Sequence, residues 1–111
     1  MANYLITGSS RGLGLALVSR LAALPSLEVG TIIATARQDN SSQLRDLVNK
    51  SSGQVGFVPL DVTSPQSIRQ AVKLVENRLQ GKGLDVLINN AGVLPVTRGG
   101  IEAMYDALRD A

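Results

Sequence analysis

The chain has 111 residues, with eleven Lys and Arg against nine Asp and Glu, and 44% of its residues are apolar. This apolar content excludes intrinsic disorder, and the length predicts a single domain, residues 1–111, with its own core. The sequence contains no Cys and no His. Their absence excludes a disulfide framework, a thiol nucleophile, a Cys/His zinc site and a His-based triad, and we expect no metal site.

The charge pattern and the hydropathy pattern exclude further partners. The net charge is only +2, no run of Lys or Arg occurs, and the aromatic residues are Tyr4, Phe57 and Tyr105. Nucleic-acid binding is therefore not expected. Polar residues interrupt every apolar run well before the ~18 residues that suggest a transmembrane helix, and residues 1–3 do not resemble a signal peptide. We expect no membrane contact and a cytoplasmic location.

Short apolar runs alternate along the chain with segments of helical spacing. The runs predict strands at residues 3–7, 31–36, 54–60 and 84–88, and helices are predicted around residues 17–22, 44–48, 65–80 and 101–108. The run at 31–36 is apolar and β-branched without alternation, which is typical of a strand buried on both faces. Ser64 and Pro65 predict the cap and first residue of the third helix, and Gly81 its end.

Strands that alternate with helices predict an α/β fold, a Rossmann-type parallel sheet with helices on both faces. A doubly wound sheet has the strand order 3-2-1-4-5-6. The four predicted strands should therefore lie in the order 3-2-1-4, truncated before a fifth strand.

A glycine-rich turn lies between the first predicted strand and the first predicted helix. Residues 7–14 read TGSSRGLG. Gly8 would allow a tight exit from the strand, Gly12 a close approach of the backbone to a pyrophosphate, and Gly14 close packing of the helix on the sheet. The N-terminus of the following helix favours an anion. The alternative is a flexible turn that has this glycine spacing by chance.

Three motifs at successive strand ends resemble the classical short-chain dehydrogenase/reductase family. They are TGSSRGLG at 7–14, Asp61-Val62 after the third strand, and NNAG at 89–92 after the fourth. The resemblance extends over essentially the whole chain. Residues 5–25 look most like sniffer-type carbonyl reductases and norsolorinic-acid-ketoreductase-like proteins. The family resemblance implies an incomplete NAD(P)-binding Rossmann domain, and an ancestral hydride transfer between NADP(H) and a carbonyl or alcohol substrate.

The end of the second strand favours NADP over NAD. An NAD site usually has an Asp or Glu about 20 residues beyond the glycine turn, where it binds the ribose 2′-hydroxyl. Here that strand ends in Thr35-Ala36-Arg37, and Arg11 lies within the glycine turn. The two guanidinium groups would hold a 2′-phosphate by charge-assisted bonds, and Ser9 would add a hydroxyl donor. Two alternatives remain: both arginines are solvated surface residues, or Asp39 serves as a displaced acid.

The resemblance also implies a set of cofactor-binding residues. The pyrophosphate and the 2′-phosphate are assigned to Gly8, Ser9, Arg11, Gly12, Leu13, Gly14 and Arg37, adenine to Asp61 and Val62, and the adenosine and its ribose to Asn90, Ala91, Gly92 and Val93. Asn89 is instead expected to bond the neighbouring strands.

The catalytic residues of the family are missing from this sequence. The family uses a Tyr with a Lys four residues later, a Ser that polarises the carbonyl, and an Asn in a proton relay. Here Gly8 stands four residues after Tyr4, and Arg109 four residues after Tyr105. Tyr105 is either a variant acid paired with Arg109 or, as we expect, a core residue of the last helix. The chain thus resembles the N-terminal half of a family member, with no catalytic residue assigned.

Three interpretations of this half remain open. It is the cofactor-binding part of a longer enzyme that continues past Ala111, a catalytically dead nucleotide-binding remnant, or an interaction module that pairs with a second chain. The fourth strand, 84–88, has four apolar residues of five. We expect it to be an edge strand of the truncated sheet, able to pair with a second chain that completes the sheet.

Overall fold

The computed structural model describes residues 1–25, 27–38 and 41–91. Seven elements alternate along this part of the chain: β1 (Ala2–Ile6), α1 (Gly12–Ala22), β2 (Val29–Ala36), α2 (Ser42–Lys50), β3 (Val55–Pro59), α3 (Pro65–Leu79) and β4 (Val86–Ile88). The predicted helix at 101–108, with Tyr105, lies outside the described residues, as do Asp39, Gly92 and Val93.

The strands form one parallel sheet in the order β3-β2-β1-β4, as the sequence predicts. Leu5 of the central strand β1 pairs with Ile33 of β2 and with Leu87 of β4. At the other side of β2, Ala36 pairs with Pro59, the last residue of β3. All four strands therefore end at the same edge of the sheet, where parallel α/β folds place their ligands.

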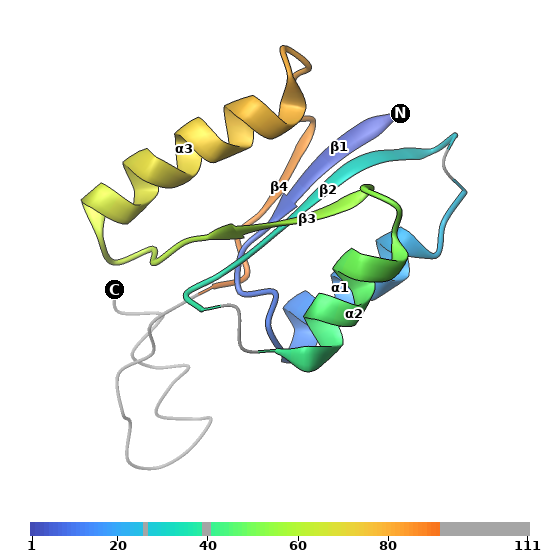
Figure 1. Cartoon of the computed structure of the whole chain (residues 1–111), viewed down its shortest axis with the longest axis horizontal. Helices are drawn as coiled ribbons and strands as arrows, with labels where there is room; N and C mark the ends of the chain where they lie inside the picture. The colour runs from blue at the N-terminus through green and yellow to red at the C-terminus, as the bar shows by residue number, and fades with distance from the viewer. Residues whose placement is uncertain (26, 39–40, 92–111) are drawn as a thin grey trace, which may run out of the picture.

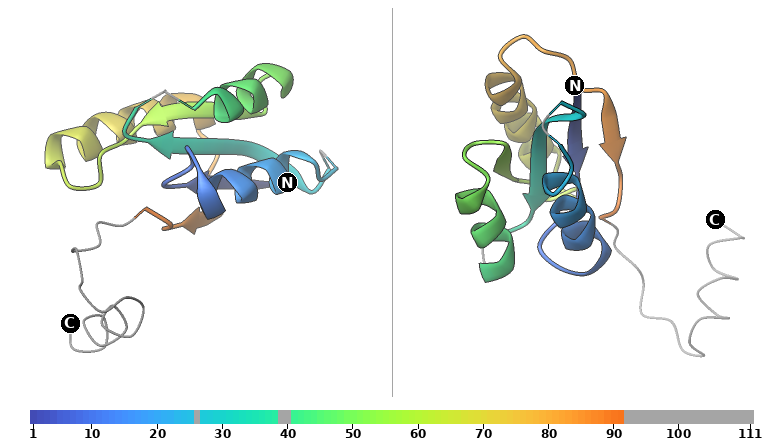
Figure 2. Two further views of the ribbon diagram at one scale, coloured as in Figure 1. Left: turned by 90° about the horizontal axis from the view of Figure 1, so that it is seen from below. Right: turned by 90° about the vertical axis from the view of Figure 1, so that its right-hand side faces the viewer.

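Helices cover both faces of the sheet, with α1 and α2 on one face and α3 on the other (Figures 1 and 2). On the first face, Ile32 and Ala34 of β2 pack in one core with Val18 of α1 and Leu44 of α2. On the second face, the core is built from Leu5, Ile33, Val58, Ala71 and Leu79. Neighbouring residues of β2 thus point into different cores, which explains why its sequence is apolar without alternation.

The ends of α3 confirm the predicted caps, with one difference. Ser64 accepts a hydrogen bond from the backbone N–H of Ser67, and Pro65 is the first helical residue. At the other end Gln80 and Gly81 both have left-handed φ angles, 50° and 83°, and the N–H of Gln80 donates to the carbonyl of Glu76. The helix therefore ends at Leu79 as Gly81 predicts, and the difference is that the non-glycine residue Gln80 is left-handed as well.

The strand β4 lies at an edge of the sheet and is shorter than predicted. It spans Val86–Ile88 and is preceded by Asp85, an exposed residue whose carboxylate accepts the N–H of Asn3. Leu87 is 57% exposed. The opposite edge strand, β3, is different, since Arg78 of α3 lies against it and donates to the carbonyl of Val55.

Candidate functional site

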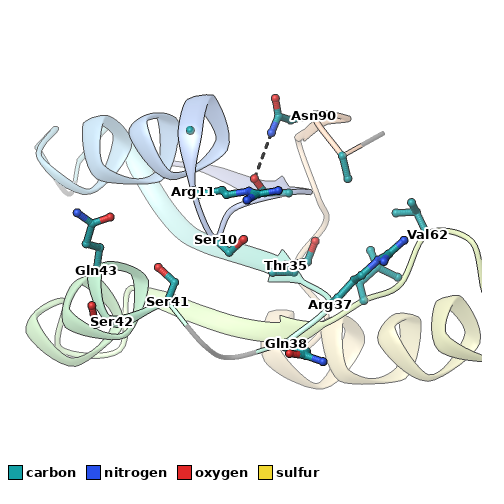
Figure 3. A pocket seen from close by; sticks show the side chains of 15 residues that line it. Ser10, Arg11, Thr35, Arg37, Gln38, Ser41, Ser42, Gln43, Val62 and Asn90 are labelled. Atoms are coloured by element: carbon teal, nitrogen blue, oxygen red, sulfur yellow. Dashed lines mark hydrogen bonds between the residues drawn. The ribbon is translucent and has the colours of Figure 1, made fainter. Parts of the chain in front are cut away.

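A cavity of about 1050 Å³ opens at the carboxyl end of the strands (Figure 3). Every strand contributes the residues that follow it or end it, and α2 contributes its first turn. The lining residues are Gly8, Ser10, Arg11, Gly12, Thr35, Ala36, Arg37, Gln38, Ser41, Ser42, Gln43, Leu60, Val62, Asn90 and Ala91. The volume and the position suit a large ligand bound across the strand ends.

The three glycines of the turn have different surroundings. Gly8 has a φ of 66°, and a Cβ there would lie 3.0 Å from the side-chain nitrogen of Asn90. A Cβ on Gly14 would overlap the carbonyl of Gly8, so α1 packs directly against the turn. Gly12 has a φ of 60°, and among the described residues no atom outside its own stretch of backbone lies within 4 Å of the position of a Cβ. Gly8 and Gly14 therefore serve the packing of the turn, whereas Gly12 leaves open space beside the cavity.

Hydrogen bonds tie the glycine turn to the segment after β4. The Thr7 hydroxyl oxygen accepts the N–H groups of Asn90 and Ala91, each at 2.9 Å. The side chain of Asn90 donates to the Gly8 carbonyl at 3.1 Å, the bond drawn in Figure 3. Asn89, which was expected to bond the neighbouring strands, is exposed, and it is Asn90 whose side chain bonds the glycine turn. The sequence also offered no role for Thr7, which organises this junction.

Ser9 does not lie where the predicted phosphate contact needs it. Its side chain is fully buried, and its hydroxyl donates to the carbonyl of Ile6 at 2.7 Å. Its N–H donates to the carbonyl of Thr35 at 2.9 Å. The hydroxyl therefore fastens the turn to β1 and the N–H fastens it to β2, and the serine of the glycine turn that lines the cavity is Ser10.

Two guanidinium groups line the cavity from different elements (Figure 3). Arg11 precedes the first residue of α1 and is exposed. Arg37 follows β2, and its side chain is 65% exposed. The lining residues of the described chain include no carboxylate. The described part of the cavity wall is therefore positively charged, which favours an anionic ligand.

Asp61 lies beside the cavity with its carboxylate held by its own loop. One carboxylate oxygen accepts the hydroxyl of Thr63 at 2.6 Å and the N–H of Thr63 at 3.0 Å. The same oxygen lies 3.8 Å from Nε of Arg37. The two bonds from Thr63, more than the charge of Arg37, lower the pKa of Asp61 below its ordinary value. Asp61 is therefore a fixed negative charge at the rim.

The remaining predicted residues divide into three groups. Val62 and Ala91 line the cavity. Leu13 is 67% exposed and does not belong to the lining, and Gly14 is buried under the turn. Gly92 and Val93 lie outside the described residues. The sequence did not identify the first turn of α2, 41–43, as part of the site, because nothing in that polar stretch shows which way α2 faces.

The model of the short chain dehydrogenase family matches residues 2–108 of this chain. The chain belongs to the short-chain dehydrogenase family. The predicted family resemblance is thereby confirmed.

Individual members of the short-chain dehydrogenase family are similar to this chain. The short-chain dehydrogenase/reductase AacuF of Aspergillus aculeatus is 39% identical over 97 residues, which are 87% of this chain and 35% of AacuF. The NADPH-bound carbonyl reductase from chicken fatty liver is 36% identical with a TM-score of 0.73, covering 93% of this chain and 40% of that one. The carbonyl reductase Sniffer of D. melanogaster is 33% identical with a TM-score of 0.77, covering 91% and 41%.

The chain spans about a third of the length of AacuF and two fifths of the two carbonyl reductases. The likeness to Sniffer agrees with the predicted sniffer-type resemblance, and the likeness to norsolorinic-acid ketoreductases stays a prediction. Among the residues that the structure describes, no helix is both long and apolar enough to cross a membrane.

Proposed function

We propose that this chain binds the adenosine and phosphate groups of NADP(H) in the cavity at the strand ends. The whole protein would transfer a hydride between NADP(H) and a carbonyl or alcohol substrate. The observation that carries the proposal is the pair Arg11 and Arg37 on a cavity whose described lining holds no carboxylate. A carboxylate at the end of β2 would repel a 2′-phosphate, and Arg37 stands directly after that strand.

The turn and the start of α1 also fit the phosphate groups of the cofactor. Arg11 occupies the N-cap position without a side-chain bond to the first turn, and that turn holds no acidic residue. The first N–H groups of α1 thus have no side-chain cap and point toward an anion site. Gly12 keeps the backbone clear of side-chain atoms at this point. The pyrophosphate would lie over Gly12, with Ser10 and Arg11 beside it.

The other residues would bind the two ends of the adenosine. Arg37 would pair with the 2′-phosphate, Val62 would contact the adenine ring, and Asn90 and Ala91 would border the ribose. Arg37 is assigned here rather than Ser9, because the Ser9 hydroxyl is buried on Ile6. When bound, NADP(H) supplies the hydride for the substrate carbonyl, and this chain's own residues bind and orient its adenosine half.

Two adenine nucleotides that differ only in the 2′-phosphate test this assignment. We expect adenosine 2′,5′-bisphosphate to bind the chain more tightly than AMP in calorimetry. Arg37→Ala should weaken the bisphosphate by about 1.5–3 kcal/mol, since a hydrogen bond to a charged group is lost, and should leave AMP nearly unchanged. Arg20→Ala, at the far end of α1, is the matched control for charge. Equal affinities in the unaltered chain, or tighter AMP, would refute the proposal.

The absence of the family's catalytic pair favours a second role for the isolated chain, binding without turnover. No Lys stands four residues after Tyr4 or Tyr105. We therefore expect no oxidation of NADPH at 340 nm with a panel of carbonyl substrates. Turnover above the buffer blank that disappears in Tyr105→Phe would instead identify Tyr105 as a variant acid.

β4 forms one edge of the described sheet, and this edge supports the proposal that a second chain pairs with it. Leu87 lies in this edge strand and is 57% exposed, and unprotected apolar edges pair with other strands. We expect the isolated chain to self-associate in sedimentation at rising concentration, and Leu87→Lys to reduce that association. Leu74→Lys, on the exposed surface of α3, is the control. A sharp monomer at every concentration would contradict the proposed pairing.

A further inference from the structure

Arg37 lies beside a carboxylate of the described chain. Nε of Arg37 lies 3.8 Å from Oδ1 of Asp61. The sheet register explains the approach: Ala36 pairs with Pro59, and the N–H of Leu60 donates to the Ala36 carbonyl. Arg37 and Asp61 are the charged residues that follow this last rung of the ladder, one from each strand.

The side chains of Asp61 and Arg37 differ in how firmly the protein holds them. Asp61 accepts two bonds from Thr63, and its own N–H donates to the hydroxyl oxygen of Ser67 at 2.8 Å. Its carboxylate is therefore held from its own loop and does not depend on Arg37 for its position. Arg37 has a long side chain that is 65% exposed, and an exposed pair at this separation binds weakly. Arg37 can turn toward a ligand while the carboxylate stays in place.

We infer that Asp61 determines how strongly this site prefers a 2′-phosphate to a 2′-hydroxyl, by placing a fixed negative charge beside Arg37. The inference rests on the proposed function and extends it to a specificity-determining residue. A 2′-phosphate that pairs with Arg37 must share the guanidinium with this carboxylate and is repelled by it. A 2′-hydroxyl carries no charge, so it neither competes with Asp61 for the guanidinium nor is repelled by the carboxylate. Asp61 thus lowers the phosphate preference that Arg37 and Arg11 create.

This effect is separable from any contact of Asp61 with the adenine ring. Adenine is common to adenosine 2′,5′-bisphosphate and AMP, so the loss of an adenine contact weakens both ligands equally. Only an electrostatic role changes the ratio of their dissociation constants. Coulomb repulsion between a phosphate and a carboxylate several ångströms apart in water predicts a change of about three- to tenfold in that ratio.

The test measures both ligands on the full chain by calorimetry at low salt. Asp61→Asn keeps an oxygen for Thr63 and removes the charge, and we expect the preference for the bisphosphate to rise about three- to tenfold. Glu76→Gln, an exposed carboxylate in the last part of α3, removes the same net charge and should leave the ratio unchanged. The gain should shrink at high salt, because the repulsion between the carboxylate and the phosphate is screened. Asp61→Ser is a second neutral variant in case the amide perturbs the loop.

The outcomes separate this inference from the proposed function. If the unaltered chain prefers the bisphosphate but neither neutral variant changes the ratio, the inference is wrong and the proposed function stands. A fall in the ratio also overturns it, because Asp61 would then orient Arg37 toward the phosphate. If the unaltered chain binds neither nucleotide, the proposed function fails, and this inference fails with it.

Discussion

At the amino end of the sheet, Asn3 joins β1 to its neighbours, whereas at the carboxyl end Thr7 and Asn90 do so. Asn3 is 7% exposed; its backbone N–H donates to Asp85, its side chain donates to the Gly83 carbonyl, and its side-chain oxygen accepts the N–H of Thr31. Thr7 likewise captures two backbone N–H groups beyond β4. Both ends use one buried polar side chain to satisfy the backbone of adjacent segments.

The two ends differ in what their glycines make room for. Gly30 at the amino end leaves space that the side-chain oxygen of Asn3 occupies. Gly12 at the carboxyl end leaves space that no side chain of the described residues occupies within 4 Å. The same hydrogen-bonding device therefore closes one end of the sheet and holds the other open beside a cavity. A substitution at the amino end of the sheet should therefore change stability alone. A substitution at the carboxyl end should change stability, ligand binding, or both.

Gly14→Ala should have the largest effect, because the new Cβ would overlap the backbone carbonyl of Gly8. A backbone overlap forces α1 away from the turn, and we expect the free energy of unfolding to fall by about 3 kcal/mol. Urea unfolding followed by circular dichroism measures this. Gly83→Ala, where no described residue beyond its two chain neighbours lies within 4 Å of the Cβ position, is the control. A loss as small as that of the control would show that α1 does not pack tightly on the turn.

Asn3→Leu should cost about 2 kcal/mol, because the Thr31 N–H and the Gly83 carbonyl lose their partner at the closed end. The same urea unfolding measures the loss. Adenosine 2′,5′-bisphosphate should still bind the folded fraction with unchanged affinity, since Asn3 lies at the opposite end of the strands from the cavity. Weaker binding by the folded variant would contradict the division between the two ends.

The comparison also shows what the sequence predicts and what it does not. Alternating apolar runs and helical segments suffice for the strand order and for both cores, and the spacing of Gly8, Gly12 and Gly14 suffices to locate the turn. The direction of a side chain within an irregular segment is a different matter. Ser9 and Ser10 are chemically identical, and the path of the chain after Gly8, with its φ of 66°, decides which hydroxyl is buried.

The same limit applies to Asn89 and Asn90 after β4. Composition cannot distinguish two neighbouring asparagines, and the difference is set by the way the chain leaves the strand. Asn90 turns back onto Gly8, while Asn89 is exposed. Nor does the sequence of 41–43 show that α2 brings its first turn to the cavity, because that depends on how α2 packs on the sheet. Residue types at strand ends are thus predictable, whereas the direction of each side chain is set by the folded backbone.

Gly12→Ala should separate ligand binding from stability at the open end. In the described part of the chain the Cβ contacts no neighbouring side chain, so the stability cost is the strain of Ala at a φ of 60°, about 1 kcal/mol. The methyl group would lie where the phosphates of the ligand are proposed to approach. We expect binding of adenosine 2′,5′-bisphosphate to weaken more than tenfold, a loss of about 1.4 kcal/mol or more. Unchanged affinity would place the phosphates elsewhere.

Thr63→Val should have the smallest effect, confined to the ionisation of Asp61 at the rim of the open end. Thr63 contributes most to lowering the pKa of Asp61, and Arg37 contributes least. Because the pKa is lowered in the folded state, the stabilising contribution of Asp61 is present above its ordinary pKa and is lost as the pH falls through the lowered value. Thr63→Val should raise the pKa of Asp61 toward its ordinary value, so that this contribution becomes smaller and its loss is complete at a higher pH.

An NMR titration of the Asp61 carboxyl carbon measures that shift directly. Arg37→Ala should raise the same pKa by less than Thr63→Val does, because the exposed guanidinium at 3.8 Å is screened by water. The order of the two shifts is the informative result. If Arg37→Ala moved the pKa further, the carboxylate would depend on the arginine rather than on its own loop. Asp61 would then not be the fixed charge that the proposed phosphate selectivity requires.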